Sequence, residues 1–161
     1  AASADPGAYG ADGINAASIG QMLQYGKPYG ATAFDASYQI DYDAIGEWTV
    51  CPEGYAVPTL DQFNAAIAKV TGGTISGNGV SGNAGITLTL MNSVMKLPIG
   101  CWLTNGDTQP QAYGEAAAYW TSSKGSNTAP WKVDINNSSA SNTGANWADA
   151  AWQLPVRCIK K

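Results

Sequence analysis

The chain has 161 residues, a length that is typical of one domain and sufficient to bury a core without metal ions. Only 12% of the residues are charged and the eight lysines and arginines form no patch, which argues against binding to nucleic-acid phosphates. Histidine is absent, which excludes Ser-His-Asp, Cys-His and histidine-based zinc sites. The net charge of −4, the 19 glycines and the many Ser, Thr, Asn and Gln residues suit an extracellular, loop-rich protein. No apolar run approaches the roughly 18 residues of a membrane-spanning helix. We therefore expect a single domain over 1–161.

The N-terminal part of the chain predicts a loose arm followed by a helix. Residues 1–12 are small and polar, as in an arm that is not fixed to the core. Asn15 can cap a helix over 16–25, and Gly26 follows as its stop. The apolar face of this helix consists of Ile19, Met22 and Leu23. Residues 31–47 combine tyrosines with aspartates that lack the spacing of a calcium loop, so they predict an irregular surface segment.

A second helix has the clearest local signal in the sequence. It begins after Thr59, which forms a capping box with Gln62 three positions later. Gly72 and Gly73 end it. Its apolar stripe consists of Phe63, Ala66, Ile67 and Val70. The pattern predicts an amphipathic helix whose stripe faces a core.

The remaining segments predict short strands joined by loops rich in Gly, Ser and Asn. Residues 71–85 predict one loop, residues 105–107 a turn, and residues 136–146 a loop at the tip of the sheet. Residues 91–96 fit a strand or a helix equally well. Strands are predicted over 86–90, 97–103, 117–122, 131–135 and 156–161.

Two of these strands alternate between apolar and charged residues. The odd-numbered positions of 131–135 are apolar, whereas Lys132 and Asp134 are predicted to face outward. The terminal strand over 156–161 has the same half-buried pattern. Because strands and helices do not follow one another in βαβ units, the sequence predicts an α+β class with an antiparallel sheet.

The chain resembles a known family in four segments that occur in the right order: CPEGYAVPTLDQF at 51–63, LPIGCWL at 97–103, AYWTSS at 118–123 and LPVRCIK at 154–160. They are similar to the Fibrobacter succinogenes major paralogous domain, a family common in Bacteroidetes surface proteins. In addition, Gln24-Tyr25-Gly26-Lys27 looks like the Gln-Trp-Gly-Arg that is often found upstream in that family.

The resemblance covers residues 19–161 and implies a C-type-lectin-like fold, related to that of formylglycine-generating enzyme. In such a fold two helices pack on a small twisted antiparallel sheet with long loops. The sequence departs from the usual family pattern at Tyr55, Cys101, Trp147 and Trp152.

The resemblance also implies a disulfide between Cys51 and Cys158. In C-type-lectin-like folds the last strand returns beside the first elements, which would make these two regions neighbours. An oxidising compartment would preserve such a bond. Two alternatives remain: a Cys101–Cys158 bond, since both residues lie in predicted strands, and a fully reduced protein.

The same scaffold is used by variable proteins of diversity-generating retroelements, which present diversified residues on a fixed sheet. Residues 121–153 are rich in Asn, Ser and Trp, a composition that adenine-directed mutagenesis of Asn codons would leave. Tryptophan among small polar residues is typical of adaptable binding surfaces. We therefore predict a ligand-binding surface formed by Lys124, Asn127, Asn137, Asn142, Asn146, Trp147, Asp149 and Trp152. The other four tryptophans are expected to belong to the scaffold.

These features predict a binding protein on a cell surface or virion, or free outside the cell, that recognises a protein or glycan on another cell or particle. A phage receptor-binding protein is one example. The alternative is a structural subunit of a bacterial fimbria or cell-surface assembly, in which the same loops would contact a neighbouring subunit. A third hypothesis is an enzyme related to formylglycine-generating enzyme.

The sequence predicts neither a catalytic group, nor a metal site, nor a cofactor. Calcium-binding lectins carry oxygen ligands where this chain has Gln111 and Ala148, so their metal motif is broken. Cys101 and Cys158 are the only candidates for a reactive cysteine pair, and Cys158 is expected to be structural. We therefore expect that the protein is not an enzyme.

Overall fold

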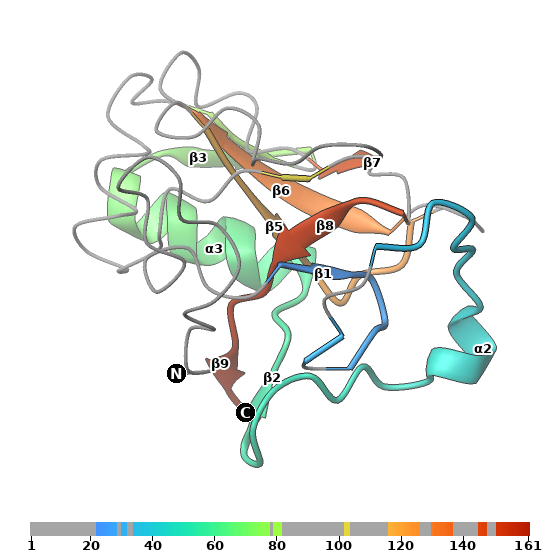
Figure 1. Ribbon diagram of the computed structural model, residues 1–161. Coiled ribbons are helices and arrows are strands. Elements are labelled where there is room, and N and C mark those ends of the chain that lie inside the picture. Colours follow the sequence, from blue (N-terminus) through green and yellow to red (C-terminus); the bar gives the residue numbers. More distant parts are fainter. Residues whose placement is uncertain are drawn as a thin grey trace, which may run out of the picture.

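The computed structural model describes residues 22–28, 30–31, 34–77, 79–81, 102–103, 116–125, 130–136, 145–147 and 151–161 (Figure 1). The elements in chain order are β1 Met22–Gln24, α2 Tyr42–Ile45, β2 Tyr55–Ala56, α3 Leu60–Thr71, β3 Thr74–Ser76, β4 Gly79–Ser81, β5 Ala116–Trp120, β6 Trp131–Asn136, β7 Ala145–Trp147, β8 Gln153–Pro155 and β9 Ile159–Lys160. All pairs among these strands are antiparallel, so the described chain has the α+β class that the sequence predicts.

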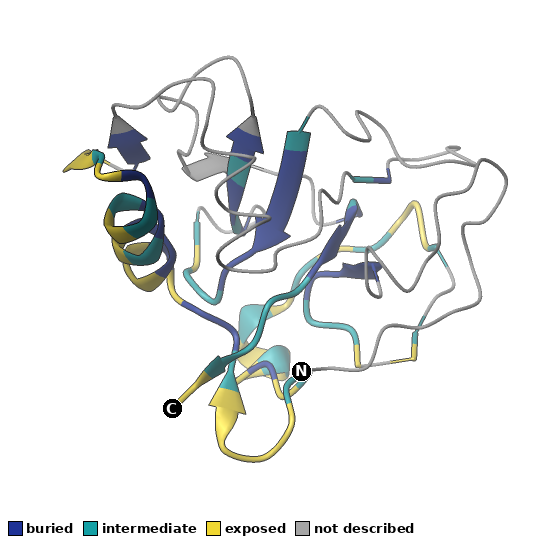
Figure 2. Ribbon diagram, turned by 90° about the vertical axis from the view of Figure 1, so that its left-hand side faces the viewer, coloured by how far each residue is buried: buried dark blue, intermediate teal, exposed yellow. Residues whose placement is uncertain are grey.

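The centre of the molecule is the three-stranded sheet β5-β6-β7. Successive side chains of a strand point to opposite faces of its sheet. Accordingly, Tyr119 of β5 joins an apolar cluster with Phe63 and Ile67 of α3, whereas Trp120 joins a second cluster with Leu23 of β1 and Leu154 of β8. Both faces of the sheet are therefore covered, and its described core residues are buried (Figure 2).

Strand β8 links the C-terminal part of the chain to the N-terminal part. It pairs with β1, with Met22 opposite Pro155 and Gln24 opposite Gln153. Gln153 also forms a bridge with Leu103. Strand β9 then pairs with β2 (Figure 1). Segments far apart in the sequence thus lie side by side.

Cys51 and Cys158 form a disulfide across 107 positions, with their Cα atoms 5.8 Å apart. This is the pairing that the resemblance implies. The bond lies next to the β2–β9 pair, where the backbone N–H of Lys161 donates to the carbonyl of Gly54. A covalent loop of this length restricts the unfolded chain strongly.

Helix α3 forms where the sequence predicts it. The Thr59 hydroxyl accepts from the backbone N–H of Gln62, and the Gln62 side chain accepts from the backbone N–H of Thr59. Gly72 ends the helix in the left-handed conformation, with φ of 70°. The first helical residue, Leu60, donates its backbone N–H to the Ser123 hydroxyl, so the helix start is fixed to the end of β5.

The helix predicted over 16–25 is wrong where the structure describes it. Residues Met22–Gln24 form β1, each 1% exposed, while residues 16–21 lie outside the described part. A short run of fully buried residues has no polar face, so its sequence pattern does not distinguish a helix from a strand. Here the pairing with β8 determines the strand conformation. The nearby glycine, Gly26, has φ of 80° and belongs to a turn closed by the N–H of Lys27 and the carbonyl of Gln24.

Two segments predicted to be irregular contain regular structure. Asp41 caps the short helix α2 by accepting from two backbone N–H groups, within the segment 31–47. Strands β3 and β4 form a hairpin in the predicted loop over 71–85, with Ile75 opposite Val80. Helix α2 is stabilised by its cap, and the hairpin by the pairing of β3 with β4. Neither segment shows the apolar periodicity from which a helix or strand is predicted.

The predicted strands near the C-terminus are partly confirmed. Strand β6 covers the predicted 131–135, whereas β7 occupies residues placed partly in the predicted tip loop. Of the predicted terminal strand over 156–161, only β9 forms, and β8 lies just before the predicted range. The predicted elements over 86–90, 91–96 and 105–107 lie outside the described residues, as does the arm over 1–12.

The prediction that Lys132 and Asp134 face outward is wrong. Lys132 is 5% exposed, because their face of the sheet is covered by the second apolar cluster. The two side chains form an ion pair within that cover. This pairing offsets the high free-energy cost of burying the Lys132 ammonium group.

Candidate functional site

The turn after β1 is held by the buried side chain of Gln24. Its Nε2 donates to the backbone carbonyls of Asp35 and Ala151, both at 2.8 Å. Its Oε1 accepts from the backbone N–H of Asp35 at 3.1 Å. One amide therefore ties the end of β1 both to Asp35, eleven positions later, and to Ala151, 127 positions later.

Aromatic side chains satisfy the carbonyls around the same turn. Trp120 Nε1 donates to Leu23 O at 2.7 Å, and Trp48 Nε1 donates to Lys27 O at 2.8 Å. The ring of Tyr25 lies between those two indoles, with centroid distances of 4.7 Å to Trp48 and 5.4 Å to Trp120. These contacts hold the Tyr25 and Trp48 rings in place.

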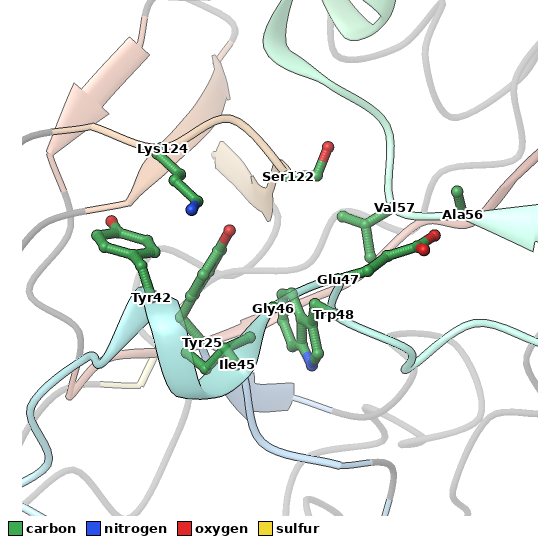
Figure 3. A pocket seen from close by; sticks show the side chains of 10 residues that line it. All are labelled: Tyr25, Tyr42, Ile45, Gly46, Glu47, Trp48, Ala56, Val57, Ser122 and Lys124. Atoms are coloured by element: carbon green, nitrogen blue, oxygen red, sulfur yellow. The ribbon is translucent and has the colours of Figure 1, made fainter.

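Beside these rings lies a pocket of about 220 Å³, which we call the aromatic pocket (Figure 3). Its lining residues are Tyr25, Tyr42, Ile45, Gly46, Glu47, Trp48, Ala56, Val57, Ser122 and Lys124. They come from the turn after β1, from α2 and the chain that follows it, from β2, and from the segment after β5. The lining combines aromatic and aliphatic walls with two opposite charges, as small-ligand sites do.

The tyrosines of the aromatic pocket remain neutral over the physiological pH range. Burial first, and then the neighbouring Tyr42 and Tyr38, raise the pKa of Tyr25 to about 12. Burial also raises the pKa of Tyr42, which the backbone N–H of Gly125 lowers in part. That N–H falls short of hydrogen-bond geometry, and the buried Tyr42 hydroxyl has no partner among the described residues.

The two charged residues of the pocket differ in their partners. The exposed Lys124 places its Nζ 5.3 Å from the centroid of the Tyr42 ring and forms no ion pair within the described chain. Glu47 accepts from Lys161 at 2.9 Å, and this contact holds the pKa of the Glu47 carboxyl below its usual range. Lys124 is therefore the cation that remains available to a ligand.

A second aromatic cluster lies over the buried Lys132–Asp134 pair. The rings of Trp102 and Trp152 stack with centroids 6.3 Å apart and an interplanar angle of 13°. Lys132 Nζ lies 5.8 Å from the Trp102 ring and 5.7 Å from the Trp152 ring. Both indoles are half-buried, so they act as the cover of the ion pair.

The predicted binding residues are divided between these places. Lys124 borders the aromatic pocket, whereas Trp152 packs in the second aromatic cluster. Asn146 and Trp147 belong to β7, where their backbones pair with those of Lys132 and Trp131. The remaining predicted residues lie outside the described part of the chain: Asn127, Asn137, Asn142 and Asp149.

Sequence reasoning missed most of the pocket, since only Ser122 and Lys124 of its lining belong to the segment 121–153. The sequence predicts a scaffold role for Trp48, and the structure makes this residue both scaffold and pocket wall. The motif at residues 24–27 was the available signal, because it contains both the buried Gln24 and the pocket residue Tyr25.

The described residues provide little support for other kinds of site. Among them, no group of three or more Cys, Asp and Glu residues is arranged to hold a metal ion. Within the same residues, no helix has the length and apolar character needed to cross a membrane. Comparisons of the chain with protein-family models, curated proteins and solved structures found no match.

Proposed function

We propose that the chain is a ligand-binding module with a C-type-lectin-like fold, displayed on a cell or virion surface or secreted. It would recognise a protein or glycan on another cell or particle. The observation that carries this proposal is the aromatic pocket, because it extends to Ser122 and Lys124 at the start of the predicted binding segment 121–153. A rigid aromatic wall beside an available cation is a suitable anchor for such a surface.

The arrangement of the described strands supports the proposed fold family. A small antiparallel sheet lies between a helix and a second strand pair, and the last strands return beside the first elements. A disulfide fastens that return. These features agree with what the resemblance implies.

The division between buried strands and Asn-rich segments supports the further proposal of a retroelement-diversified protein. Strands β5, β6 and β8 contribute buried framework residues, and the Asn-rich parts of 121–153 connect them in sequence. Substitutions in such connections would leave the framework unchanged. The proposed module thus separates variable recognition from a constant core.

Binding through 121–153 can be tested with the labelled protein against panels of bacterial cells, phage particles and immobilised glycans. The triple variant K124A/N127A/N142A is expected to lose binding to whichever target the parent recognises. The control variant D61A/K69A changes two exposed residues of α3 and is expected to bind as the parent does. Equal loss in both variants, or no loss in the first, would contradict the proposed surface.

Two further observations separate this proposal from its alternatives. Sequencing around the gene should reveal a template repeat and a reverse transcriptase, with adenine-linked substitutions confined to codons 121–153. Sedimentation of the purified protein should show no concentration-dependent polymer. Polymers that disappear in the K124A/N127A/N142A variant would instead indicate a fimbrial subunit.

A further inference from the structure

We infer that the aromatic pocket binds a free carboxylate attached to a single apolar residue, as at the C-terminus of a peptide or in a free amino acid. This inference rests on the proposed binding function and specifies the chemistry that one part of the surface recognises. Three features of the pocket carry it: the grouping of its hydrogen-bond donors, its volume with its apolar walls, and the carboxylate at its other end.

The first feature is a group of donors without acceptors. Figure 3 shows the Lys124 side chain pointing into the pocket toward the ends of Tyr25 and Tyr42 that carry their hydroxyls. The Tyr42 hydroxyl is buried and has no hydrogen-bond partner among the described residues. Because burial raises the pKa of Tyr42 above its ordinary value, this hydroxyl stays protonated and can donate. A cation without a carboxylate partner and a buried phenol without a hydrogen-bond partner favour an anionic acceptor.

The second feature is the size and character of the walls. A volume of about 220 Å³ is smaller than the roughly 300–1,000 Å³ of sites for drug-sized molecules, so only a small group can enter. Trp48, Ile45 and Val57 supply an apolar lining next to the donor end. An anion without an apolar body, such as inorganic phosphate, would leave these walls unused.

The third feature is the position of Glu47. Its carboxylate lies away from the Lys124 end of the pocket (Figure 3). Besides its contact with Lys161, this carboxylate can accept a further hydrogen bond, so this end of the pocket favours an N–H donor on the ligand. Carboxylate, apolar side chain and N–H together are the groups of one amino-acid residue with a free C-terminus.

The test uses four small probes and the intact, oxidised protein. Ac-Phe-OH represents a peptide terminus, free phenylalanine represents the amino acid, Ac-Phe-NH₂ lacks the charge, and phenyl phosphate replaces the carboxylate by a phosphate. Titrations are followed by the indole N–H signals of Trp48 and Trp120 in a nitrogen–proton correlation spectrum. We expect Ac-Phe-OH to shift the Trp48 signal and Ac-Phe-NH₂ to bind at least about tenfold more weakly, because the charge-assisted hydrogen bonds are lost.

Two variants connect the effect to the donors. Lys124→Ala should weaken Ac-Phe-OH binding about tenfold, and Tyr42→Phe should weaken it several-fold while leaving Ac-Phe-NH₂ unaffected. Lys69→Ala, which removes an exposed lysine of α3, should change neither. The Tyr42→Phe protein is expected to fold, since the Tyr42 hydroxyl has no hydrogen-bond partner to lose among the described residues.

The outcomes are distinct. Tighter binding of Ac-Phe-OH than of free phenylalanine assigns the site to a peptide terminus, and the reverse order assigns it to an amino acid. Equal binding of acid and amide, stronger binding of phenyl phosphate, or no response of Trp48 to any probe would overturn the inference. Because Lys124 belongs to both tests, the variant N127A/N142A, which keeps Lys124, separates them. Loss of cell or particle binding in N127A/N142A together with any of these three results would overturn this inference and leave the proposed function standing.

Discussion

At the scale of single residues, the turn at 24–27 determines the position of the pocket walls. Gly26 has a positive φ of 80°, and a Cβ placed on it would lie 2.4 Å from the Cδ1 atom of Ile45. Ile45 itself lines the aromatic pocket. The absence of a side chain at Gly26 therefore allows α2 to pack closely against the turn.

Alanine substitutions at Gly54 and Gly26 separate the cost of a positive φ from the cost of a steric clash with Ile45. Gly54 has nearly the same φ, 79°, but no atom lies within 4 Å of its hypothetical Cβ. Gly54→Ala should lose about 1–2 kcal/mol of unfolding free energy from the backbone conformation alone. Gly26→Ala should lose about 1–3 kcal/mol more through overpacking, and should also weaken ligand binding in the pocket. Urea denaturation measures both losses, and equal losses would show that Ile45 moves aside freely.

Tyr25 should make the protein sensitive to alkali. Its pKa of about 12 in the folded state exceeds the ordinary value of 10.0, so the folded protein retains a proton that the unfolded chain releases. The stabilising contribution is complete below pH 10 and is lost as the pH rises toward 12. Two pH units correspond to about 2–3 kcal/mol. Tyr25→Phe should flatten this decline in denaturation curves measured from pH 9.5 upward, whereas an unchanged slope would assign the decline to other groups.

At the scale of elements, a helix or strand can be predicted from the sequence when the residues that stabilise it are close to one another in the chain. Helix α3 is such a case, because its capping box, apolar stripe and terminal glycine lie within one continuous segment. Strand β1 consists of three residues that become a strand because β8, more than a hundred positions later, pairs with them. The pocket is assembled from four separate segments, so no local pattern could indicate it before their packing was known.

The misplaced Lys132 illustrates the same limit. Alternation in β6 correctly indicated a strand and two faces, but it could not show that both faces are covered. Only the position of the second aromatic cluster, which depends on Trp102 and Trp152, determines that this lysine is enclosed.

The ion pair in β6 should therefore behave as a buried unit. Lys132→Met leaves the Asp134 carboxylate without its cation and should cost about 3–5 kcal/mol of unfolding free energy. The double variant K132M/D134L should recover much of this loss, because it removes the remaining charge. Chemical denaturation of Lys132→Met, Asp134→Leu and the double variant yields the coupling energy. Simple additivity would mean that the pair is solvated.

At the scale of the whole molecule, the disulfide joins two regions that define the fold. Its closure of 107 positions corresponds to about 4–5 kcal/mol in the chain-entropy model. The variant C51S/C158S should lose stability by this amount in urea denaturation. Reduced parent protein should show the same midpoint as the variant. A variant as stable as the oxidised parent would show that non-covalent contacts alone restrain this part of the unfolded chain.

The disulfide also divides the molecule mechanically. A pulling force applied at Lys161 passes to Cys51 through a covalent bond, so the chain between Cys51 and Cys158, with α3 and the central sheet, carries no tension. The residues before Cys51 lie outside this protected loop, and they include Tyr25, Tyr42 and Trp48 of the pocket. Tension between the two ends would peel β1 from β8 and open the pocket while the sheet stays folded. A bound ligand would then be released while the loop closed by the disulfide stays folded.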